Sequence, residues 1–334
     1  MRQPRRHRDQ GFTLVEVLVV ITVIGGLAAI LLPAIHAAHL ATQRTQCANH
    51  LRQLAIGNAG FVSTHDRYPA GIEQWFFSSS VAYRGIPLFA RLLPHLEQNN
   101  VLIEWDYNDP INNANKGSRS NTAVVLPILL CPADRIARNP VVITSRDWHY
   151  GLSSYGGNGG TKSYFPTQSK TDGVFFTTGE ASEPKANQEP IRPTDIMDGV
   201  SHTLLFGERS HDDPNYKTFN AAGWGEPLDE WGWWGASTSR KMIGHVTMSA
   251  EVPINYRLGF TYAQRSGQNP PADSFSQFQS YVDRRVSAYG SSHVGGCNFA
   301  FADGSVRFLS DSTSLSVLAA LSTRAGSEMA QQAE

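Results

Sequence analysis

The apolar residues of this chain are concentrated in one long run near the N-terminus, from Phe12 to Ile35. As a helix the run would be about 36 Å long, which is enough to cross a hydrocarbon core of about 30 Å. Pro33 lies inside the run and removes a backbone donor, so it should kink or loosen the helix locally. The pattern predicts a membrane-spanning segment over residues 12–35.

Beyond this run, apolar residues recur at three- and four-residue steps among polar ones, as at Leu51 and Leu54. Such spacing is typical of a helix with one apolar face. Gly57 and Gly60 are expected to mark its end. The sequence therefore predicts one helix over residues 12–60, with its outer half packed on a globular domain.

From residue 61 to 326 the pattern changes to short apolar runs separated by Gly, Asn, Asp and Pro, which is typical of strands and turns. We expect an α+β, pilin-like fold in which the long helix packs on a mostly antiparallel, β-rich domain, followed by a tail over residues 327–334. Residues 208–220 should form a polar loop, and helical pieces are expected at 86–97 and 312–324. The candidate strands are residues 123–130, 141–144, 173–178, 203–207 and 242–248, with two more flanking Asp303-Gly304.

Positive charge is concentrated before the apolar run. Residues 1–11 contain four arginines against a single acidic residue, Asp9, so this leader should stay in the cytoplasm by the positive-inside rule. A secretory signal peptide would have its small-residue cleavage site after the apolar core, whereas Gly11 precedes it. We expect a single-pass protein with a cytoplasmic N-terminus and a globular domain that is periplasmic or at the cell surface.

The arginine-rich leader, Gly11, Phe12, Glu16 and Pro33 together resemble the N-terminus of type IV prepilins and type II secretion pseudopilins. The resemblance implies that prepilin peptidase cuts between Gly11 and Phe12 at the inner membrane and methylates the new N-terminus. It also implies that the helix assembles with other pilin-like subunits, with Glu16 as the assembly charge. An ionised Glu in lipid costs roughly 2.5 kcal/mol or more, so it needs a partner such as the new amine of Phe12. The alternative is a plain signal anchor, which would not explain the position of Gly11 or the single charge of Glu16 within the apolar run.

Composition and charge narrow the function classes. The chain has 334 residues, 41% of them hydrophobic, and its net charge of −1 becomes −4 once the leader is removed. It can bury a sizeable core, and nothing in this balance favours nucleic acid as a partner. The three cysteines, Cys47, Cys131 and Cys297, allow at most one internal disulfide, and their spacing neither selects a pair nor fits a zinc motif.

The segment that begins at His293 predicts a β-hairpin. Apolar residues alternate on both sides of Asp303-Gly304, a pair that favours a two-residue type I′ turn. His293 could cap the hairpin by bonding to backbone or to Asp303, which would make His293, Asp303 and Gly304 a structural motif. A metal or catalytic His-Asp pair is the alternative, but no nucleophile accompanies it and its spacing fits no metal template.

Nearly the whole chain also resembles a planctomycete-type family of prepilin-like proteins that carry a domain of unknown function, numbered 1559. Its C-terminal motif of His, nine residues and Asp-Gly matches His293 and Asp303-Gly304. The resemblance implies a disulfide between Cys47 and Cys131, because both lie in matching segments, whereas the family more often has a small residue at the position of Cys297. The other matching segments are residues 47–54, 130–134, 154–158, 198–208 and 321–326.

Four tryptophans, Trp224, Trp231, Trp233 and Trp234, lie close together in the sequence and could stack on sugar rings. They could equally belong to the core or to a subunit contact. If they bind a surface glycan, the chain would be a membrane-anchored glycan-binding module. This is the alternative to a prepilin-like subunit.

No cofactor is expected. Asp172, Asp195, Asp198, Glu208 and Asp303 could supply oxygen ligands to calcium, but no Asp-rich loop of fixed spacing is present. A secreted hydrolase is a third class, against which the lack of a convincing nucleophile and base argues. We therefore expect a non-enzymatic, prepilin-like subunit of a type IV pilus- or type II secretion-like assembly.

Overall fold

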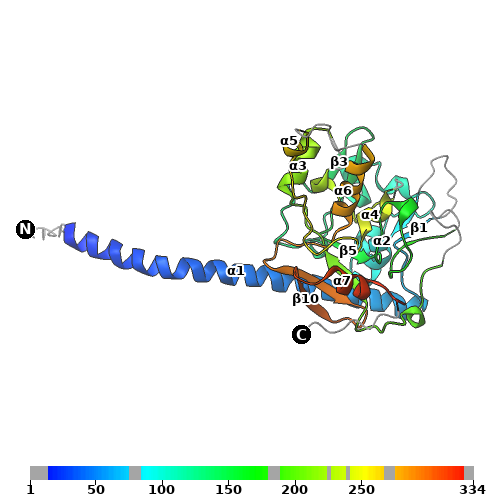
Figure 1. Ribbon diagram of the computed structural model, residues 1–334, viewed down its shortest axis with the longest axis horizontal. Helices are drawn as coiled ribbons and strands as arrows, with labels where there is room; N and C mark the ends of the chain where they lie inside the picture. Colours follow the sequence, from blue (N-terminus) through cyan, green and yellow to red (C-terminus); the bar gives the residue numbers. More distant parts are fainter. Residues whose placement is uncertain are drawn as a thin grey trace, which may run out of the picture. The chain divides into compact units, whose positions relative to one another are not determined.

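The computed structural model describes residues 14–74, 84–179, 189–223, 227–237, 241–266 and 275–326. It separates into two units, residues 1–43 and residues 44–334. The described part of the first unit is the N-terminal portion of a long helix. The second unit contains the rest of that helix and the globular domain (Figure 1).

The long helix, α1 (Leu14–His65), includes Pro33. Its large apolar side chains in the first unit are exposed, from 83% for Leu14 to 41% for Leu40. Among the described residues, α1 is the one helix that is long and apolar enough to cross a membrane. The predicted long apolar N-terminal helix is thus confirmed.

The second part of α1 buries one face in the globular unit. Cys47, Leu51 and Leu54 are fully buried there, at the three- and four-residue steps that the sequence shows. The predicted end at Gly57 and Gly60 is wrong, because the helix continues to His65. A Cβ on Gly57 would lie 2.6 Å from the Leu96 side chain, so this glycine makes room for Leu96 to pack on α1 and does not end the helix.

The elements of the chain are short outside α1. The strands are β1 (Ile72–Glu73), β2 (Ile86–Pro87), β3 (Val141–Ile143), β4 (Trp148–Tyr150), β5 (Tyr155–Asn158), β6 (Thr177–Thr178), β7 (Leu204–Glu208), β8 (Thr247–Met248), β9 (Gly296–Phe301) and β10 (Val306–Ser310). The other α-helices are α2 (Leu88–Leu92), α3 (Pro214–Ala221), α4 (Met242–Val246), α5 (Tyr262–Ser266), α6 (Phe275–Ser287) and α7 (Leu315–Ser322). The 3₁₀ helices are η1 (Leu93–Leu96), η2 (Asn99–Leu102), η3 (Pro110–Asn113), η4 (Gly117–Arg119), η5 (Asn121–Ala123), η6 (Pro127–Leu129), η7 (Pro166–Gln168), η8 (Pro193–Asp195) and η9 (Leu228–Glu230).

The main sheet has five strands in the order β10-β9-β7-β5-β8. All neighbours are antiparallel except β5 and β8, which are parallel. Two smaller sheets have the orders β2-β1-β6 and β3-β4. The expected α+β class, with a long N-terminal helix and mostly antiparallel sheets, is confirmed.

Three predicted strands are wrong in whole or in part. Of residues 173–178, only the last two lie in a strand, β6. Residues 123–130 contain the 3₁₀ turns η5 and η6, and Pro127 at the start of η6 cannot donate to a strand ladder. Residues 242–248 are α4 for most of their length, with only the last two in β8. Short apolar runs do not distinguish a buried helix from a buried strand, which explains the last of these errors.

The expected polar loop at residues 208–220 contains helix α3. The Asp213 side chain accepts the backbone N–H of Tyr216, and Pro214 occupies the first turn. An Asp cap followed by Pro is a helix-start signal that the polar composition obscured. The predicted strands near residues 141–144 and 203–207 are confirmed as β3 and β7.

Strands β9 and β10 form the predicted hairpin, but its turn differs from the expected one. The Gly304 N–H donates to the Phe301 carbonyl at 2.9 Å, and the Phe301 N–H donates to the Ser305 carbonyl at 2.9 Å. Gly304 has a φ of +82°, whereas Asp303 is not in the left-handed region that a type I′ turn requires of both central residues. The loop is a type I turn followed by a left-handed glycine.

Candidate functional site

The predicted processing residues, Gly11 and Phe12, lie outside the described residues. Glu16 lies in the first turn of α1, and it is exposed there among apolar side chains such as Leu14 and Val17. A carboxylate in such a setting fits the charge argument made from the sequence. Its role in assembly remains a prediction.

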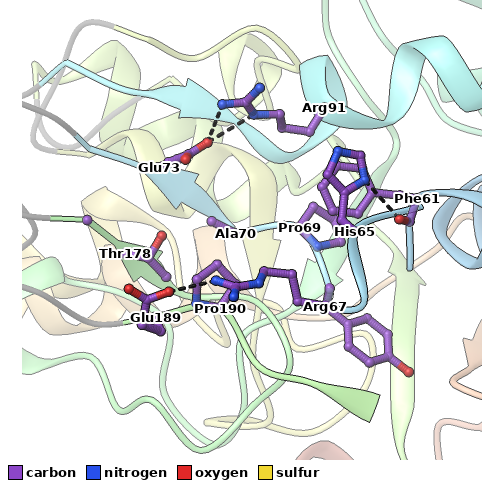
Figure 2. Close-up of a pocket in the computed structure, with 12 residues that line it drawn as sticks. Phe61, His65, Arg67, Pro69, Ala70, Glu73, Arg91, Thr178, Glu189 and Pro190 are labelled. Atoms are coloured by element: carbon purple, nitrogen blue, oxygen red, sulfur yellow. Dashed lines mark hydrogen bonds and ion pairs between the residues drawn. The ribbon is translucent and has the colours of Figure 1, made fainter. Parts of the chain in front are cut away.

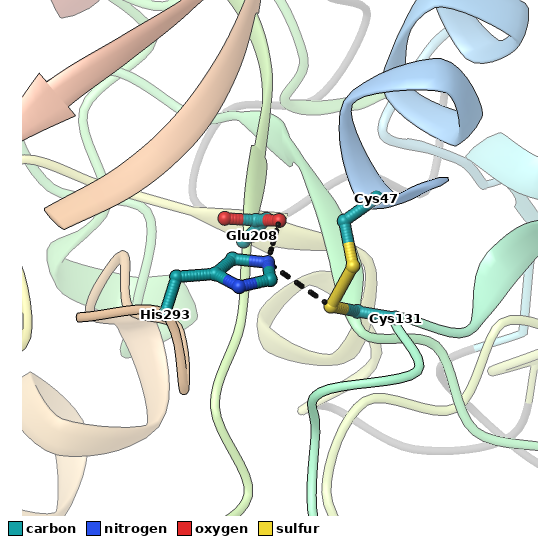
Figure 3. A group of neighbouring side chains, drawn as sticks. All are labelled: Cys47, Cys131, Glu208 and His293. Atoms are coloured by element: carbon teal, nitrogen blue, oxygen red, sulfur yellow. Dashed lines mark hydrogen bonds and ion pairs between the residues drawn. A yellow bond between two sulfur atoms is a disulfide. The ribbon is translucent and has the colours of Figure 1, made fainter. Parts of the chain in front are cut away.

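Four side chains that are far apart in the sequence converge in the globular unit: Cys47, Cys131, Glu208 and His293 (Figure 3). They come from α1, from the segment after η6, from the end of β7 and from the segment before β9. Cys47 and Cys131 form a disulfide with Cα atoms 5.1 Å apart, which is the pairing that the family resemblance implied. The thiol of Cys297 is free and buried.

The imidazole of His293 lies between the disulfide and the Glu208 carboxylate. Its Nε2 atom is 3.5 Å from Cys131 Sγ and 3.3 Å from Glu208 Oε1. The backbone N–H of His293 donates to Ser291 Oγ at 3.1 Å, which fixes the segment before β9. All four side chains of the cluster are buried, so water is largely excluded from these contacts.

The Glu208 carboxylate is held by strand β9. Its Oε2 accepts the backbone N–H of Asn298 at 2.7 Å, and its Oε1 accepts the Asn298 side-chain amide at 2.9 Å. Cys297 lies next to it, with its thiol 3.7 Å from the Glu208 carbonyl oxygen. Burial, and then the charge of Glu208, raise the pKa of Cys297 well above its usual range, so this thiol stays protonated.

Tyr155 and His50 line the α1 side of the disulfide. The Tyr155 hydroxyl donates to the Cys47 carbonyl at 3.4 Å, and His50 Nδ1 donates to the Leu130 carbonyl at 3.0 Å. Burial, and then the charges of Glu208 and Asp134, raise the pKa of Tyr155 well above its usual range. Burial lowers the pKa of His50, and its bond to Leu130 offsets this in part. Both groups therefore favour neutral forms beside the disulfide.

The predicted hairpin cap at His293 is wrong. Its side chain contacts Cys131 and Glu208, whereas Asp303 accepts the N–H of Ser305 at 2.8 Å and lies 3.6 Å from Arg307 Nη2. The two parts of the motif, His293 and Asp303-Gly304, lie at opposite ends of β9 and have different structural roles. Asp303 and Gly304 shape the turn, and the histidine belongs to the buried cluster.

A second buried pair, Asp134 and His211, does not form a hydrolytic triad. His211 Nδ1 is 2.6 Å from Asp134 Oδ2, and its Nε2 donates to the Trp231 carbonyl at 2.8 Å. Ser154 donates to the aspartate instead of to the imidazole. Burial alone would raise the pKa of Asp134, but the charge and hydrogen bonds of His211 and the Ser154 hydroxyl lower it. Asp134 and the Trp231 carbonyl occupy the two imidazole nitrogens, so neither nitrogen is placed to accept a proton from a serine nucleophile, and the pair is structural.

The tryptophans do not form an exposed sugar-stacking platform. Trp231 and Trp234 are 2% and 0% exposed, and Trp233 is half-buried. His245 stacks between Trp231 and Trp233, with ring centroids 3.9 Å and 4.0 Å apart. Trp224 lies outside the described residues. The core interpretation holds for the tryptophans whose positions are described.

The acidic residues proposed for calcium have separate partners. Asp172 accepts the N–H of Thr161, Asp195 accepts the N–H of Arg192, and Asp198 accepts a backbone N–H from residue 326. Within the part of the chain that the structure describes, only Glu208 of this set joins a group of potential metal ligands. The other members of that group offer sulfur and nitrogen, which calcium does not favour.

A pocket of about 250 Å³ lies at the C-terminal end of α1 (Figure 2). Its charged side chains form two ion pairs: Arg67 Nη1 is 2.7 Å from Glu189 Oε2, and Arg91 Nε is 2.9 Å from Glu73 Oε2. His65 is bonded to the Phe61 carbonyl of its own helix at 3.0 Å. Because both arginines of the described lining are already paired, the pocket is poorly suited to an anionic ligand.

The sequence did not indicate that His293 and Glu208 meet, although each stood in a matching segment. One feature of the sequence could have indicated a buried partner for Glu208. This residue lies at the end of the apolar run of β7, where a buried carboxylate needs such a partner. The buried Asp134–His211 pair was also missed, because its members lie 77 residues apart. Contacts of this kind depend on the tertiary fold and not on local spacing.

Comparison with known proteins agrees with this architecture. Residues 36–316 match the family described as "Protein of unknown function (DUF1559)", so the chain belongs to this family. Residues 6–32 match the prokaryotic N-terminal methylation motif. No curated protein and no solved structure matches the chain. The motif and the apolar helix α1 together define a prepilin-like, membrane-anchored subunit, and α1 is the one helix among the described residues that is long and apolar enough to span a membrane.

Proposed function

We propose that this chain is a non-enzymatic subunit of a type IV pilus- or type II secretion-like surface assembly. The observation that carries the proposal is the match of residues 6–32 to the methylation motif, directly over the start of an apolar helix of 52 residues. A subunit of this class would be cut by prepilin peptidase between Gly11 and Phe12. It would then pack with other pilin-like subunits through the exposed apolar part of α1.

Glu16 supports this function through its charge. A carboxylate within a lipid-exposed helix is expensive unless it is paired, and the new amine of a neighbouring subunit's Phe12 would be a suitable partner. Pairing of this kind would fix the axial position of each incoming helix. The exposed apolar side chains from Leu14 to Leu40 would then be covered by neighbouring helices and lipid.

The globular domain would act through contacts outside the cytoplasm. Its buried disulfide is consistent with an oxidising compartment, since such bonds are rare in the cytosol. The Asp134–His211 pair has no hydroxyl nucleophile on its imidazole, which supports a non-catalytic role. The surface-glycan alternative loses its main support because Trp231 and Trp234 are buried.

N-terminal sequencing of the mature protein tests the processing step. We expect the mature chain to start at methylated Phe12, and Gly11→Val to leave the precursor uncut because the peptidase needs a small residue there. Gly25→Val is the matched control: no atom lies within 4 Å of a Cβ at this helical position, so cleavage should proceed. A mature chain that starts at Met1, or beyond Ile35, would refute the proposal.

Electron microscopy of labelled cell-surface fractions tests the assembly step. We expect filaments or short pseudopilus-like structures that contain this chain and disappear in the Gly11→Val variant. A processed chain that stays monomeric in the membrane, with no higher assembly by crosslinking, would contradict assembly while leaving the membrane anchor intact.

A further inference from the structure

The cluster around the disulfide has the dimensions of a metal site. One ligand atom each from Cys47, Cys131, Glu208 and His293 lies within 4.8 Å of every other. Two thiolates, an imidazole and a carboxylate form a ligand set that suits a tetrahedral zinc-class ion. No single sequence motif contains it, because the four residues come from four separate segments of the fold.

Two edges of the required tetrahedron are already in place. Zinc bonds of about 2.3 Å to sulfur and about 2.0–2.1 Å to nitrogen or oxygen put sulfur and nitrogen ligands about 3.5 Å apart, and nitrogen and oxygen ligands about 3.3 Å apart. The Cys131 Sγ to His293 Nε2 distance is 3.5 Å, and the His293 Nε2 to Glu208 Oε1 distance is 3.3 Å. The same nitrogen faces both neighbours, as a shared metal would require (Figure 3).

The disulfide prevents this ion from binding. A disulfide holds its sulfur atoms about 2.05 Å apart, whereas two sulfur ligands of one tetrahedral zinc are about 3.8 Å apart. Sulfur atoms in a disulfide also lack the thiolate charge that binds zinc. The oxidised bridge and the metal site are therefore mutually exclusive states of the same cysteines.

The carboxylate of the cluster is already oriented as metal ligands usually are. Both oxygens of Glu208 accept hydrogen bonds from Asn298, and this residue would be the outer-shell partner of the ion. The cluster is buried, so a bound ion would be shielded from competing water. The two sulfur atoms would have to move apart to admit the ion.

We propose that the reduced form of Cys47 and Cys131, together with Glu208 and His293, binds one zinc-class divalent ion, and that the oxidised form does not. A water-soluble phosphine produces the reduced form: the S–S bond breaks, each sulfur takes a proton, and phosphorus is oxidised to the phosphine oxide with oxygen from water. Metal binding then releases the two thiol protons to solvent. Zinc binding by the reduced chain does not depend on pilus assembly, so it can be tested independently of filament yield.

The test uses the full-length protein in detergent micelles, with and without phosphine treatment. Cobalt(II) is added as a spectroscopic probe, and zinc is added to displace it. We expect one cobalt per chain with sulfur-to-cobalt charge-transfer absorption only after reduction, bleached by one equivalent of zinc. The oxidised protein gives the background from the other histidines of the chain.

Variants identify the ligands. Glu208→Gln keeps the shape of the side chain and should weaken zinc binding more than Asn298→Ala, for which outer-shell effects suggest about 10–100-fold. His293→Ala and Cys131→Ser should abolish the site or its charge-transfer band. Cys297→Ala is the matched thiol control and should still bind one zinc, because this thiol is not one of the four proposed ligands and donates to the Glu208 and Asn298 carbonyls.

Several outcomes would overturn the proposal. They include equal zinc binding by the oxidised and reduced chains, loss of binding in Cys297→Ala, and unchanged binding in Glu208→Gln and His293→Ala. If reduction unfolds the globular unit, zinc should restore its near-ultraviolet circular dichroism in the wild type and not in Glu208→Gln. Failure of zinc to do so in the wild type would also refute the site.

Discussion

Two stretches of helix α1 are both rich in apolar residues but have opposite surroundings. Between Leu14 and Leu40 the large apolar side chains are 41–83% exposed, whereas Cys47, Leu51 and Leu54 are fully buried in the globular unit. The first stretch is apolar on all sides, and the second has one apolar face among polar residues. A helix with one apolar face is covered on that face by its own domain, whereas a helix that is apolar on all sides is covered by lipid or by partner subunits. The arrangement of apolar residues distinguishes the two cases better than their number does.

Removing the disulfide should have the largest effect on the second stretch. The disulfide joins residues 84 positions apart and so restricts the conformations of the unfolded chain. In Cys47→Ala/Cys131→Ala this restriction is lost, which should lower the free energy of unfolding by about 4 to 5 kcal/mol in chain-entropy estimates. We expect urea unfolding of the globular unit, followed by tryptophan fluorescence, to show a loss of this size. Cys297→Ala is the control with a smaller expected loss. Equal unfolding midpoints for the double variant and the wild type would show that the disulfide does not stabilise the globular unit.

A matched pair of leucine substitutions tests the comparison within one helix. Leu54 is fully buried and Leu27 is 58% exposed. Leu54→Ala should lower the free energy of unfolding of the globular unit by about 2 to 5 kcal/mol through lost packing. Leu27→Ala should change it by less than about 0.5 kcal/mol. Similar losses in the two variants, measured by urea unfolding in detergent, would mean that the first stretch also packs on the globular domain.

The sequence predicted those parts of the fold whose cause is local. The apolar run and the spacing of Leu51 and Leu54 indicated α1, and alternation around Asp303-Gly304 indicated the hairpin. The end of α1 was misplaced because a glycine can serve close packing as well as helix termination. Residues 242–248 were misassigned because apolar runs of that length suit a helix or a strand equally.

The buried cluster could be predicted only in part. The disulfide was implied by family resemblance, and His293 was recognised as one half of a motif. The contact of His293 with Glu208 was not, since it requires that the end of β7 and the start of β9 lie side by side. Side-chain partners across a sheet are set by strand order, which a single sequence does not reveal.

Glu16→Ala should separate membrane insertion from assembly in the first stretch. Removing the charge should favour insertion, because an ionised carboxylate in lipid is costly, while deleting the ionic contact proposed for neighbouring subunits. We expect normal recovery in the membrane fraction and loss of sheared surface filaments. Glu16→Asp keeps the charge and should retain part of the filament yield. Normal filament yield from Glu16→Ala would rule out the role assigned to this charge.

A pH effect is expected in the globular unit, and His245 is one source of it. Its Nδ1 atom accepts the backbone N–H groups of Gly232 and Trp233 at 3.2 Å and 3.3 Å, so protonation there would remove both bonds. Burial, and then the charges of Arg209 and Lys241, hold the pKa of His245 well below its usual value of 6.5. The unfolded chain therefore binds a proton that the folded chain does not.

Because the unfolded chain binds more protons than the folded chain, the globular unit loses stability as the pH falls. The stability contribution of neutral His245 is complete above about pH 6.5 and is lost as the pH falls towards the lower pKa of the folded chain, by at most about 1.4 kcal/mol per pH unit. We expect urea unfolding to show a globular unit that is less stable at pH 5.5 than at pH 7.5, with a contribution from this histidine on the order of 1 kcal/mol at most. His245→Asn should reduce this pH dependence even if it lowers stability overall. An NMR titration that shows the His245 ring protonated at pH 5.5 in the folded protein would contradict the assignment. Helix α1 before residue 44 should keep its helical signal over the same range, because its apolar residues are covered by the membrane or by detergent and not by the core around His245.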